Sequence, residues 1–359
     1  MRPLTIIGGG LGGLALGAAL SREGVPVEIC EAGRLPRHRV CGEFIAGLRP
    51  DVIARLGLAP HLRDAAVHRH TGWHLGGKLR FSAPLPEPAL GLSRRLLEER
   101  LLTAFRAAGG QLRENTRVPF AETDAEPAGR VWAAGRRPEA SSPWLGLKIH
   151  CRHFTLGQDL EIHLGRGGYA GATRVEDGRV NICGLFRTRP DVRAPRETLL
   201  AAYLEACGLS ALAARVTAGD PDATSATAVS GLDFSHSWHE RRRFSLGDHE
   251  GPIPPYTGHG MAMALESAAL ALAPLAAYSR AEIEWAEALA TVRAGLATRH
   301  DSRLRWARWL HPWLLHPAGQ NVLITLARAR LLPFAKIYRA THGPGTLAAN
   351  QPNTEVNHC

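Results

Sequence analysis

The chain lacks the sequence features that mark several common classes of protein. It has six cysteines in 359 residues and no C-x-x-C pair, so we expect neither a zinc site nor a disulfide framework. A reducing compartment follows, and we expect a cytoplasmic protein. No run of about 18 unbroken apolar residues occurs after the N-terminus, so no transmembrane span is predicted. There is no internal repeat or low-complexity segment.

Acidic residues are the scarcer charged class: 43 Lys and Arg against 33 Asp and Glu give 43 − 33 = +10. A basic balance suits anionic ligands, nucleic acid or a membrane surface, although solvated arginines explain most of the excess. The only run of basic residues is Arg241-Arg242-Arg243, which disfavours nucleic acid. With 45% apolar and 21% charged residues, the chain is an ordinary globular protein of about two domains.

The N-terminus reads as a β-α-β unit. Leu4–Ile7 and Val27–Cys30 are short apolar strands, and Gly12–Arg22 between them is a helix of small residues. Six glycines in the first 20 residues argue against a signal peptide, whose apolar segment should be a smooth helix. The unit predicts a parallel sheet.

Later segments predict further helices and a second sheet. Gly76-Gly77 predicts a hairpin turn. Expected strands are Val67–Leu75, Lys78–Phe81, short strands near Gln111 and Val131, Leu145–His153, Leu160–Leu164, Tyr169–Val175, Arg179–Phe186 and Phe244–Leu246. Expected helices are Pro50–Leu56, Arg94–Ala108, Pro195–Cys207, Ser210–Val216, one starting at Gly260, and nearly all of the chain from Glu282 to Arg339.

The glycine-rich turn after the first strand carries a specific motif. Gly8-x-Gly10-x-x-Gly13 lies between strand and helix, and Glu31 ends the second strand 31 − 13 = 18 residues later. Gly8 permits the tight turn, Gly10 lets a pyrophosphate approach the backbone, and Gly13 lets helix and strand pack. Glu31 can bond ribose hydroxyls. The segment therefore predicts a dinucleotide site, for FAD or NAD, at a helix N-terminus.

A second segment decides between these cofactors. Gly247-Asp248 is followed by Pro252-Ile253-Pro254-Pro255 and by Gly258-His259-Gly260-Met261. Here the sequence resembles the flavoprotein monooxygenase superfamily of the p-hydroxybenzoate hydroxylase and geranylgeranyl reductase type. The resemblance implies that Asp248 contacts the ribityl chain of FAD and that the helix after Gly258 points at the flavin. Amides there would stabilise reduced flavin; the alternative for Asp248 is a turn or cap residue.

Two further segments fit this resemblance. Arg94-x-x-Leu97-Glu98-x-x-Leu101 matches the family helix whose arginine approaches the FAD diphosphate, the alternative being a solvated arginine. Arg39-Val40-Cys41-Gly42-Glu43 resembles the loop of the geranylgeranyl reductase branch beside the isoalloxazine. Cys41 would be a proton donor or a redox-sensitive thiol, or merely a small loop residue. The expected cofactor-binding residues are Gly8, Gly10, Leu11, Gly13, Glu31, Ala32, Arg39, Cys41, Arg94, Gly247, Asp248, Pro255, Gly258, His259, Gly260 and Met261.

The sequence departs from the family at three places. Ala133-Ala134-Gly135-Arg136 lacks the aspartate of the family D-G motif, which weakens any inference about NADPH handling. His249 replaces the usual alanine after Gly-Asp. His259 replaces an acid, which would place a titratable group near the flavin, the alternative being an ordinary loop histidine. The absence of W-x-W-x-I-P argues against a flavin halogenase. No thioredoxin-like domain fits after the flavin motifs, which argues against the large phenol hydroxylases.

The substrate side rests on the second sheet. Strand alternation puts Lys148 and His150 on one face. Facing inward they would orient or deprotonate a phenol; facing outward, which we favour, they are solvated. Neighbouring His150, Cys151 and His153 alternate between faces, so no metal site is expected. Gly-Gly-Tyr-x-Gly at 167–171, together with Val180–Gly184, resembles FAD-dependent oxidoreductases found beside type III polyketide synthases, which implies a lipid-like phenolic or pyrone substrate.

Tryptophans recur in the C-terminal helices. Trp306, Trp309 and Trp313 follow an i, i+3, i+7 spacing among Arg303, Arg305 and Arg308. An interfacial helix on a membrane has this pattern. A packed helix with core tryptophans has it too, and we favour that interpretation.

Together these features predict an α/β (α+β) fold: an FAD-binding, Rossmann-like βαβ domain, an antiparallel-sheet substrate domain and C-terminal helices. We assign 1–65, 90–143 and 226–282 to the first, 66–89 and 144–225 to the second, 283–342 to the helices and 343–359 to a tail. The expected activity is monooxygenation through a flavin C4a-hydroperoxide, with NADPH or NADH as reductant and an aromatic, polyketide or isoprenoid substrate. Catalytic candidates are Cys41, Lys148, His150 and His259. The alternatives are C=C reduction and non-catalytic flavin or lipid binding.

Overall fold

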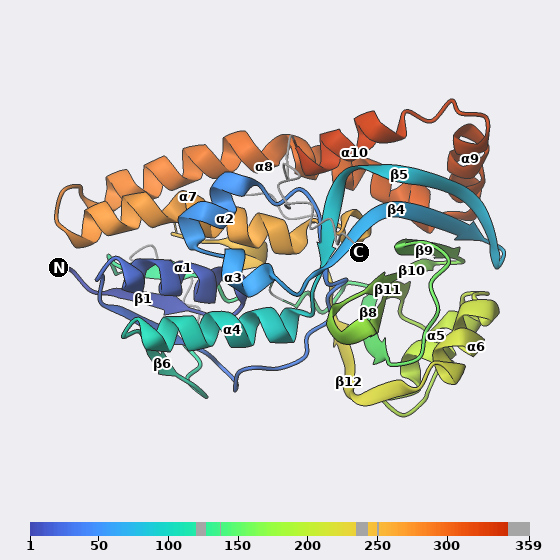
Figure 1. The fold of residues 1–359 in the computed structure, drawn as a ribbon, viewed down its shortest axis with the longest axis horizontal. Coiled ribbons are helices and arrows are strands. Elements are labelled where there is room, and N and C mark those ends of the chain that lie inside the picture. Colours follow the sequence, from blue (N-terminus) through green and yellow to red (C-terminus); the bar gives the residue numbers. More distant parts are fainter. Residues whose placement is uncertain (120–126, 137, 235–242, 250, 344–359) are drawn as a thin grey trace, which may run out of the picture.

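The computed structural model describes residues 1–119, 127–136, 138–234, 243–249 and 251–343. In these residues the chain forms two sheets and a layer of helices (Figure 1). The five described cysteines are free thiols. Arg241, Arg242, Cys359 and all of the predicted tail except Gly343 lie outside the described residues.

The smaller sheet confirms the predicted β-α-β opening. Strands β1 (Leu4–Ile7) and β2 (Val27–Cys30) pair in parallel and are joined by α1 (Leu11–Arg22), and β1 also pairs in parallel with β7 (Arg130–Trp132). In spatial order the strands are β6 (Gln111–Arg113), β2 (Val27–Cys30), β1 (Leu4–Ile7) and β7 (Arg130–Trp132). The predicted strand at 244–246 is reduced to one parallel bridge between Trp132 and Ser245.

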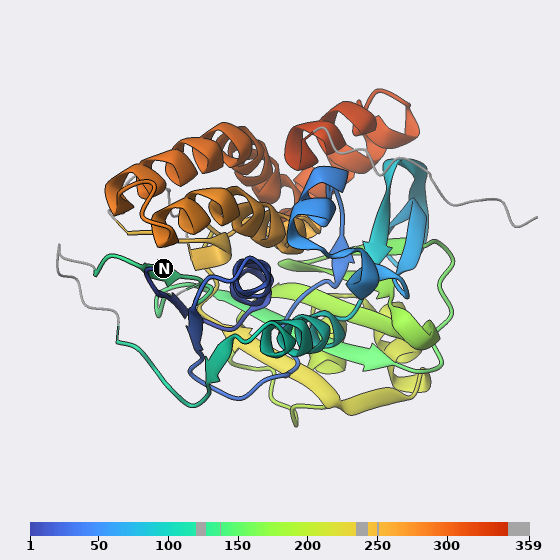
Figure 2. The same ribbon diagram turned by 60° about the vertical axis from the view of Figure 1, so that its left-hand side comes forward.

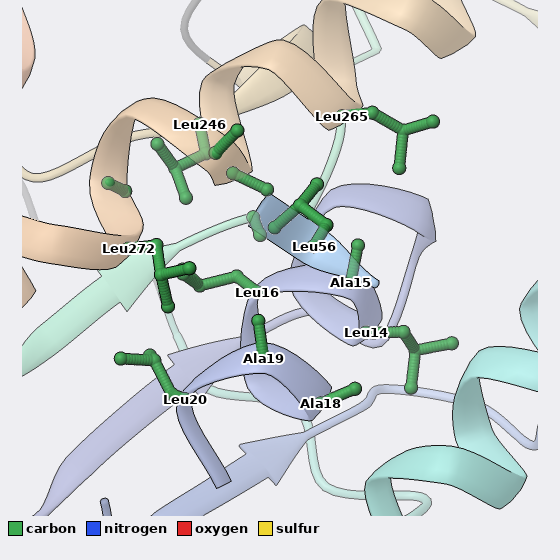
Figure 3. Close-up of a cluster of buried hydrophobic side chains, with 14 of the residues drawn as sticks. Leu14, Ala15, Leu16, Ala18, Ala19, Leu20, Leu56, Leu246, Leu265 and Leu272 are labelled. Atoms are coloured by element: carbon green, nitrogen blue, oxygen red, sulfur yellow. The ribbon is translucent and has the colours of Figure 1, made fainter. Parts of the chain in front are cut away.

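Helix α1 packs between this sheet and two other helices, α4 (Arg94–Ala107) and α7 (Gly260–Ser279). Its leucines, alanines and glycines are small enough that eleven of its twelve residues are buried. Figure 3 shows Leu16 and Leu20 of α1 beside Leu272 of α7 in this core. Among the described residues, α7 is the one helix long and apolar enough to span a membrane, and its burial against α1 and α8 accounts for that composition.

The larger sheet has eight strands and is mixed. All its pairs are antiparallel except β4 (Ala66–Leu75) and β9 (Leu160–Gly165), which run in parallel, so the prediction of a purely antiparallel sheet is wrong in this detail. In spatial order the strands are β12 (Pro221–Ser230), β8 (Trp144–Cys151), β11 (Val180–Arg187), β10 (Gly168–Arg174), β9 (Leu160–Gly165), β4 (Ala66–Leu75), β5 (Lys78–Gly91) and β3 (Phe44–Ile45).

Strands β3 and β12 and the short helix α3 (Ala59–Leu62) were not predicted, and β5 continues to Gly91 beyond its predicted end at Phe81. β12 begins with proline, is largely polar and contains a bulge between Asp222 and Thr227. Such a sequence is tolerated because β12 is an edge strand, where a missing backbone donor costs little. The predicted domain boundary at 226 falls inside this strand. The helix expected from Pro195 begins at Leu199 instead.

The remaining helices cover the two sheets. Figures 1 and 2 both place α8, α9 and α10 along one outer edge of the molecule. α8 contributes Val292 and Leu296 to the core around α1, and Leu314 to a second core against the larger sheet. The helices not yet given are α2 (Pro50–Leu56), α5 (Leu199–Ala206), α6 (Ser210–Ala218), α8 (Trp285–Leu315), α9 (Pro317–Arg328), α10 (Phe334–His342), and the short 3-10 turns η1 (Glu176–Gly178), η3 (Gly247–His249) and η4 (Pro255–Thr257).

The preferred interpretation of the tryptophans as core residues is wrong. Trp306, Trp309 and Trp313 are 46%, 59% and 41% exposed. The buried face of α8 at this point consists of other residues, among them Leu304 and Leu310. A pattern of i, i+3, i+7 identifies one face of a helix but not which face meets the core.

Candidate functional site

A cavity of about 330 Å³, here called cavity A, lies at the carboxyl ends of β1, β2 and β7. This is the edge at which parallel α/β sheets bind ligands. Fourteen of the sixteen predicted cofactor-binding residues line it: Gly8, Gly10, Leu11, Glu31, Ala32, Arg39, Cys41, Arg94, Gly247, Asp248, Pro255, Gly258, Gly260 and Met261. The other two, Gly13 and His259, are not part of its lining.

The glycine-rich turn forms one wall of cavity A. Gly8 has a φ of +110°, and a Cβ there would lie 2.5 Å from the Ala133 carbonyl oxygen. A Cβ at Gly13 would lie 2.1 Å from the Gly8 carbonyl oxygen, so Gly13 serves the helix-on-strand contact. Gly10 caps α1 without any side-chain hydrogen bond. The first amides of α1 are therefore left for a ligand, and helix N-terminal amides favour an anion.

Glu31 anchors the loop that follows β2. One carboxylate oxygen accepts the Gly9 amide at 2.9 Å, and the other accepts the Gly33 amide at 3.1 Å and the Arg37 guanidinium at 3.0 Å. The side chain is at the cavity, where the motif predicts ribose recognition. Both of its oxygens already accept hydrogen bonds from the protein, so Glu31 also fixes the shape of the turn.

Two arginines bring positive charge to the same wall. The Nε of Arg94 donates to Glu98 at 2.7 Å, and the Nε of Arg39 lies 3.6 Å from the other oxygen of Glu98. Burial would lower the pKa of Arg94, but Glu98 more than offsets this and holds it above its usual value. A Cβ on Gly10 would lie 3.3 Å from Arg94 Nη2. Arg94 is thus at the helix N-terminus rather than in solvent, and this donor set fits a diphosphate.

The first residues of α7 form another wall of cavity A. His259 caps this helix without a side-chain hydrogen bond, so the Gly260 and Met261 amides also face the cavity. His249 is buried, bonds the Gly135 carbonyl at 3.0 Å through Nδ1, and stacks on Trp132 at 5.5 Å. The segment 133–136, which lacks the family aspartate, still lines the cavity and is held there by His249.

His259 points away from cavity A. Its Nδ1 donates to the Ala46 carbonyl at 2.7 Å, and its Nε2 accepts from Arg303 at 2.9 Å. Burial lowers its pKa well below the ordinary value, which is consistent with a neutral ring. Arg303 in turn pairs with Glu266 at 2.7 Å. The structure therefore brings His259 into a buried network behind the α7 N-terminus, not to the cavity surface.

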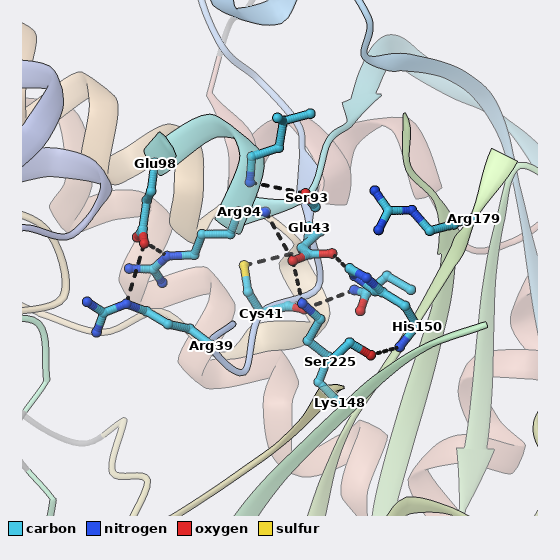
Figure 4. Close-up of polar contacts among 12 residues, drawn as sticks. Arg39, Cys41, Glu43, Ser93, Arg94, Glu98, Lys148, His150, Arg179 and Ser225 are labelled. Carbon is cyan, nitrogen blue, oxygen red and sulfur yellow. Dashed lines mark hydrogen bonds and ion pairs between the residues drawn. The ribbon is translucent and has the colours of Figure 1, made fainter. Parts of the chain in front are cut away.

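Lys148 and His150 lie on one face of β8, as alternation predicts, but they are buried, so the favoured interpretation of solvated side chains is wrong. Both bond the carboxylate of Glu43: Lys148 Nζ at 2.5 Å and His150 Nε2 at 2.6 Å (Figure 4). Glu43 itself has a φ of +54° and accepts the Arg94 amide at 3.0 Å. Through Glu43, Lys148 and His150 hold the loop that contains Cys41, and neither side chain lines cavity A, B or C.

The negative charge of Glu43 is compensated by its direct contacts with Lys148 and His150. Burial by itself would raise the pKa of Glu43, but the Lys148 charge and the hydrogen bonds from His150 and Lys148 lower it to about 2. His38 lies edge-on to the His150 ring at 5.3 Å, and burial together with the Lys148 charge lowers its pKa to about 4. The cluster ties the β2–β3 loop to the larger sheet.

A second space, cavity B, adjoins cavity A. It has a volume of about 90 Å³, and the two share Val40, Cys41, Gly42, Phe44, Arg136, Pro255 and Gly258. One wall is the face of the larger sheet, through Tyr169, Gly171 and Cys183. Burial raises the pKa of Cys41, and burial raises that of Cys183 to about 12. Both thiols at cavity B are therefore protonated at neutral pH.

A third space, cavity C, continues from cavity B towards the C-terminal helices. Its volume is about 80 Å³, and it shares Phe44, Leu160, Ile162, Tyr256 and Thr257 with cavity B. Its other walls are apolar side chains of β4, β5, α8, α9 and α10, such as Trp73, Leu310 and Ile324. The three cavities thus form a series from a polar to an apolar end.

Sequence reasoning missed several lining residues. Phe44 and Tyr256 border cavities B and C, and Trp132 borders cavity A. Alternation could have selected Tyr169, Gly171 and Thr173 as one face of β10. Phe44 carried no such signal, because its neighbours in space come from distant parts of the chain.

Comparisons with known proteins agree with this fold. No protein-family model matches the chain. The structure of Pseudomonas aeruginosa PqsL with 2-aminobenzoylacetate has a TM-score of 0.66 and 19% identity, covering 94% of this chain and 99% of PqsL. Klebsiella pneumoniae HpxO with FAD and uric acid has a TM-score of 0.71 and 17% identity, covering 94% and 97%. The flavin-dependent brominase Bmp2 has a TM-score of 0.70 and 14% identity, covering 95% and 93%.

The chain therefore has the fold of FAD-dependent monooxygenases and flavin-dependent halogenases. At sequence level it is 29% identical over 132 residues to Conditioned medium factor receptor 1 of Dictyostelium discoideum. That match covers 33% of this chain and only 26% of the receptor. The chain thus matches about a quarter of the length of this curated relative.

Proposed function

We propose that the chain is an FAD-dependent monooxygenase acting on an aromatic or polyketide-derived, lipid-like substrate. The observation that carries the proposal is the convergence of fourteen motif residues on cavity A, beside a second cavity with protonated thiols. The Gly10 and Leu11 amides with Arg39 and Arg94 would hold the FAD diphosphate. Asp248 would hold the ribityl chain, and the amides at Gly260 and Met261 would hold the flavin edge.

Bound FAD would supply two-electron transfer and oxygen activation. The balanced reaction takes a substrate C–H, O₂, NAD(P)H and a proton to C–OH, water and NAD(P)⁺. The chain's own contribution is to orient the substrate in cavity B and to exclude water from it. The apolar side chains of Phe44, Ile162 and Leu185 in its wall support that role.

The surface beside cavity A supports the proposal that the reductant is an anionic nucleotide, NADPH or NADH. An open groove of about 940 Å³ adjoins it and carries seven arginines against two aspartates. The arginines are Arg37, Arg39, Arg94, Arg95, Arg136, Arg179 and Arg196. Five of them, Arg37, Arg39, Arg94, Arg95 and Arg179, pair with glutamates. Arg136 and Arg196 form no ion pair within the described residues and would meet the pyrophosphate of NADPH or NADH.

Cavities B and C together support a substrate with two unlike parts. A ring would occupy cavity B, which is bordered by Arg136 and the Cys41 and Cys183 thiols. An apolar extension would occupy cavity C, whose lining is mostly apolar. We therefore propose a phenol or pyrone with an alkyl or isoprenoid chain.

One observation favours a second function, flavin-dependent C=C reduction. That reaction transfers hydride to one carbon and needs a proton for the other, and a protonated Cys41 thiol borders both cavities. The variant Cys41→Ser separates the two. Reduction should fall at least about tenfold because a hydroxyl is a far weaker acid, while hydroxylation should be nearly unchanged.

The test of the main proposal is the visible spectrum of the purified protein, followed anaerobically with NADPH or NADH and then with air. Bleaching and oxygen uptake stimulated by 4-alkylphenols support monooxygenation. Bleaching without coupled oxygen uptake favours reduction. Bound flavin that no reductant bleaches favours a non-catalytic binding protein, and a colourless protein that takes up no FAD refutes the proposal.

A further inference from the structure

The charge of the chain is concentrated at its C-terminal helices. From Ser302 to Gly343 the sequence contains seven Lys and Arg and no Asp or Glu, against a net charge of +10 for the whole chain. Five of the seven are exposed: Arg305, Arg328, Arg330, Lys336 and Arg339. No ion pair is formed by these five within the part of the chain that the structure describes. The segment therefore presents uncompensated positive charge.

The same segment exposes large apolar side chains. Six of the nine large hydrophobic residues that are exposed in the described structure fall between 306 and 331. Three are tryptophans of α8, and the others are Val322 at 46%, Leu326 at 36% and Leu331 at 70% exposure. The ring centroids of Trp306 and Trp309 are 5.7 Å apart, and those of Trp309 and Trp313 are 6.3 Å apart. The tryptophans thus form a continuous strip along one face of α8.

The combination of exposed tryptophans and positive charge indicates which kind of partner binds this surface. Soluble monomers rarely expose contiguous apolar patches of this kind without a binding role. Trp prefers the boundary between headgroups and acyl chains, and clustered Lys and Arg are attracted to anionic headgroups. A second copy of the chain would bring equal positive charge and be repelled. A polyphosphate would leave the aliphatic Val322, Leu326 and Leu331 without apolar partners.

We propose that segment 302–343, the basic tryptophan face, docks on the surface of an anionic lipid bilayer. The face inserts its tryptophans to headgroup depth and does not span the bilayer. Its helices also wall cavity C from the inside, through Leu310, Ile324 and Phe334. Transfer of a lipid-like substrate from the bilayer into cavity C rests on the proposed function, whereas docking does not.

The direct test is binding of the full chain to vesicles of phosphatidylcholine with and without phosphatidylglycerol. We expect binding to the anionic vesicles only, and its loss at about 1 M salt, where the Debye length is about 3 Å. Brominated acyl chains should quench tryptophan fluorescence. Equal binding to neutral vesicles, or no binding to either, overturns the proposal.

Two sets of variants locate the face. Trp306→Ser, Trp309→Ser and Trp313→Ser combined should lower vesicle affinity at least about tenfold and abolish quenching, since all three are exposed and replaceable. The control, Val67→Ser with Leu79→Ser, changes residues of similar exposure on β4 and β5 and should leave affinity unchanged. Arg328→Gln with Arg330→Gln should weaken binding, whereas Arg63→Gln with Arg106→Gln, which removes the same charge, should not.

Other occupants of the face have distinct signatures. A dimer in sedimentation velocity that the triple tryptophan variant abolishes would assign the face to a second copy and overturn the proposal. Trp-dependent binding of an oligonucleotide without vesicle binding would also overturn it. FAD content and turnover of a short soluble phenol are measured on the same variants. Vesicle binding by a protein without flavin would refute the proposed function and leave docking intact.

Discussion

Cavities A and C differ in how the chain builds them. Cavity A is walled largely by short, glycine-rich segments at the ends of β1, β2 and α7, and Glu31, Arg39, Arg94 and Asp248 are among its charged groups. Cavity C is walled mostly by apolar side chains, and its lining comes from elements that range from β3 to α10. A polar nucleotide site needs fixed amides and close approach, which local motifs encode. An apolar pocket needs only shape and volume, which many sequences can supply.

The buried ion pair between Lys148 and Glu43 holds the loop that contains Cys41. Removing this ion pair should have the largest effect on the stability of the chain. Lys148→Met leaves the buried Glu43 carboxylate with only His150 and the Arg94 amide as partners. Removing one partner of a buried pair costs about 3–5 kcal/mol, so we expect the free energy of unfolding in urea to fall by that amount. A loss below about 1 kcal/mol would contradict the burial of this pair.

The same pair makes a prediction about pH. The pKa of Glu43 is lowered to about 2 in the folded chain from its ordinary 4.5. A depressed carboxyl pKa stabilises the fold above the unfolded value and loses that contribution as pH falls through the folded value. The stability difference between wild type and Glu43→Gln should therefore be full above pH 4.5 and shrink towards pH 2. A difference that does not change between these values would refute the assignment.

Cavity A should be the more sensitive of the two cavities to a single added side chain. Gly10→Val places a branched side chain at the α1 N-terminus, where its Cβ would lie 3.3 Å from Arg94 Nη2. We expect FAD affinity to fall at least about 100-fold, or about 2.7 kcal/mol, and Asp248→Ala to weaken it as well. Gly157→Val, in an exposed loop remote from the site, is the matched control. Full FAD occupancy in both site variants would sink the site assignment.

Cavity C should respond more weakly and only to chain length. Ala327→Phe fills part of its 80 Å³ volume. Excluding about two methylenes costs about 1.6 kcal/mol, so KM for a long-chain 4-alkylphenol should rise roughly tenfold, with little change for a short one. Ala329→Phe, two residues on and exposed, is the control. Equal effects on long and short chains would contradict a tail in cavity C.

An exposed ion pair provides the smallest expected effect. Arg280 bonds Glu282 at 2.6 Å, but both side chains face solvent. Because water screens such pairs, Arg280→Ala should leave Tm unchanged within error, in contrast to Lys148→Met. A clear drop in Tm would mean that local geometry outweighs burial in this chain.

The same contrast explains which parts of the site could be predicted. Gly8, Gly10 and Glu31 were identified because their spacing follows from the geometry of one turn and one helix. Lys148 and His150 were correctly predicted to share one face of their strand, but they were expected to be exposed to solvent and are buried. Alternation carries no information about Glu43, their partner 105 and 107 residues away. Phe44, shared by all three cavities, had no signal at all.

The sequence by itself determined the β-α-β opening, six of the eight strands of the larger sheet (all but β3 and β12) and the glycine turn of cavity A, since each depends on residues close together in the chain. Tertiary structure alone decided that Glu43 neutralises Lys148, that His259 turns away from the cavity, and that the tryptophans of α8 face solvent. In each case a periodic pattern defines a face, and only packing against distant elements decides whether that face meets core, ligand or water.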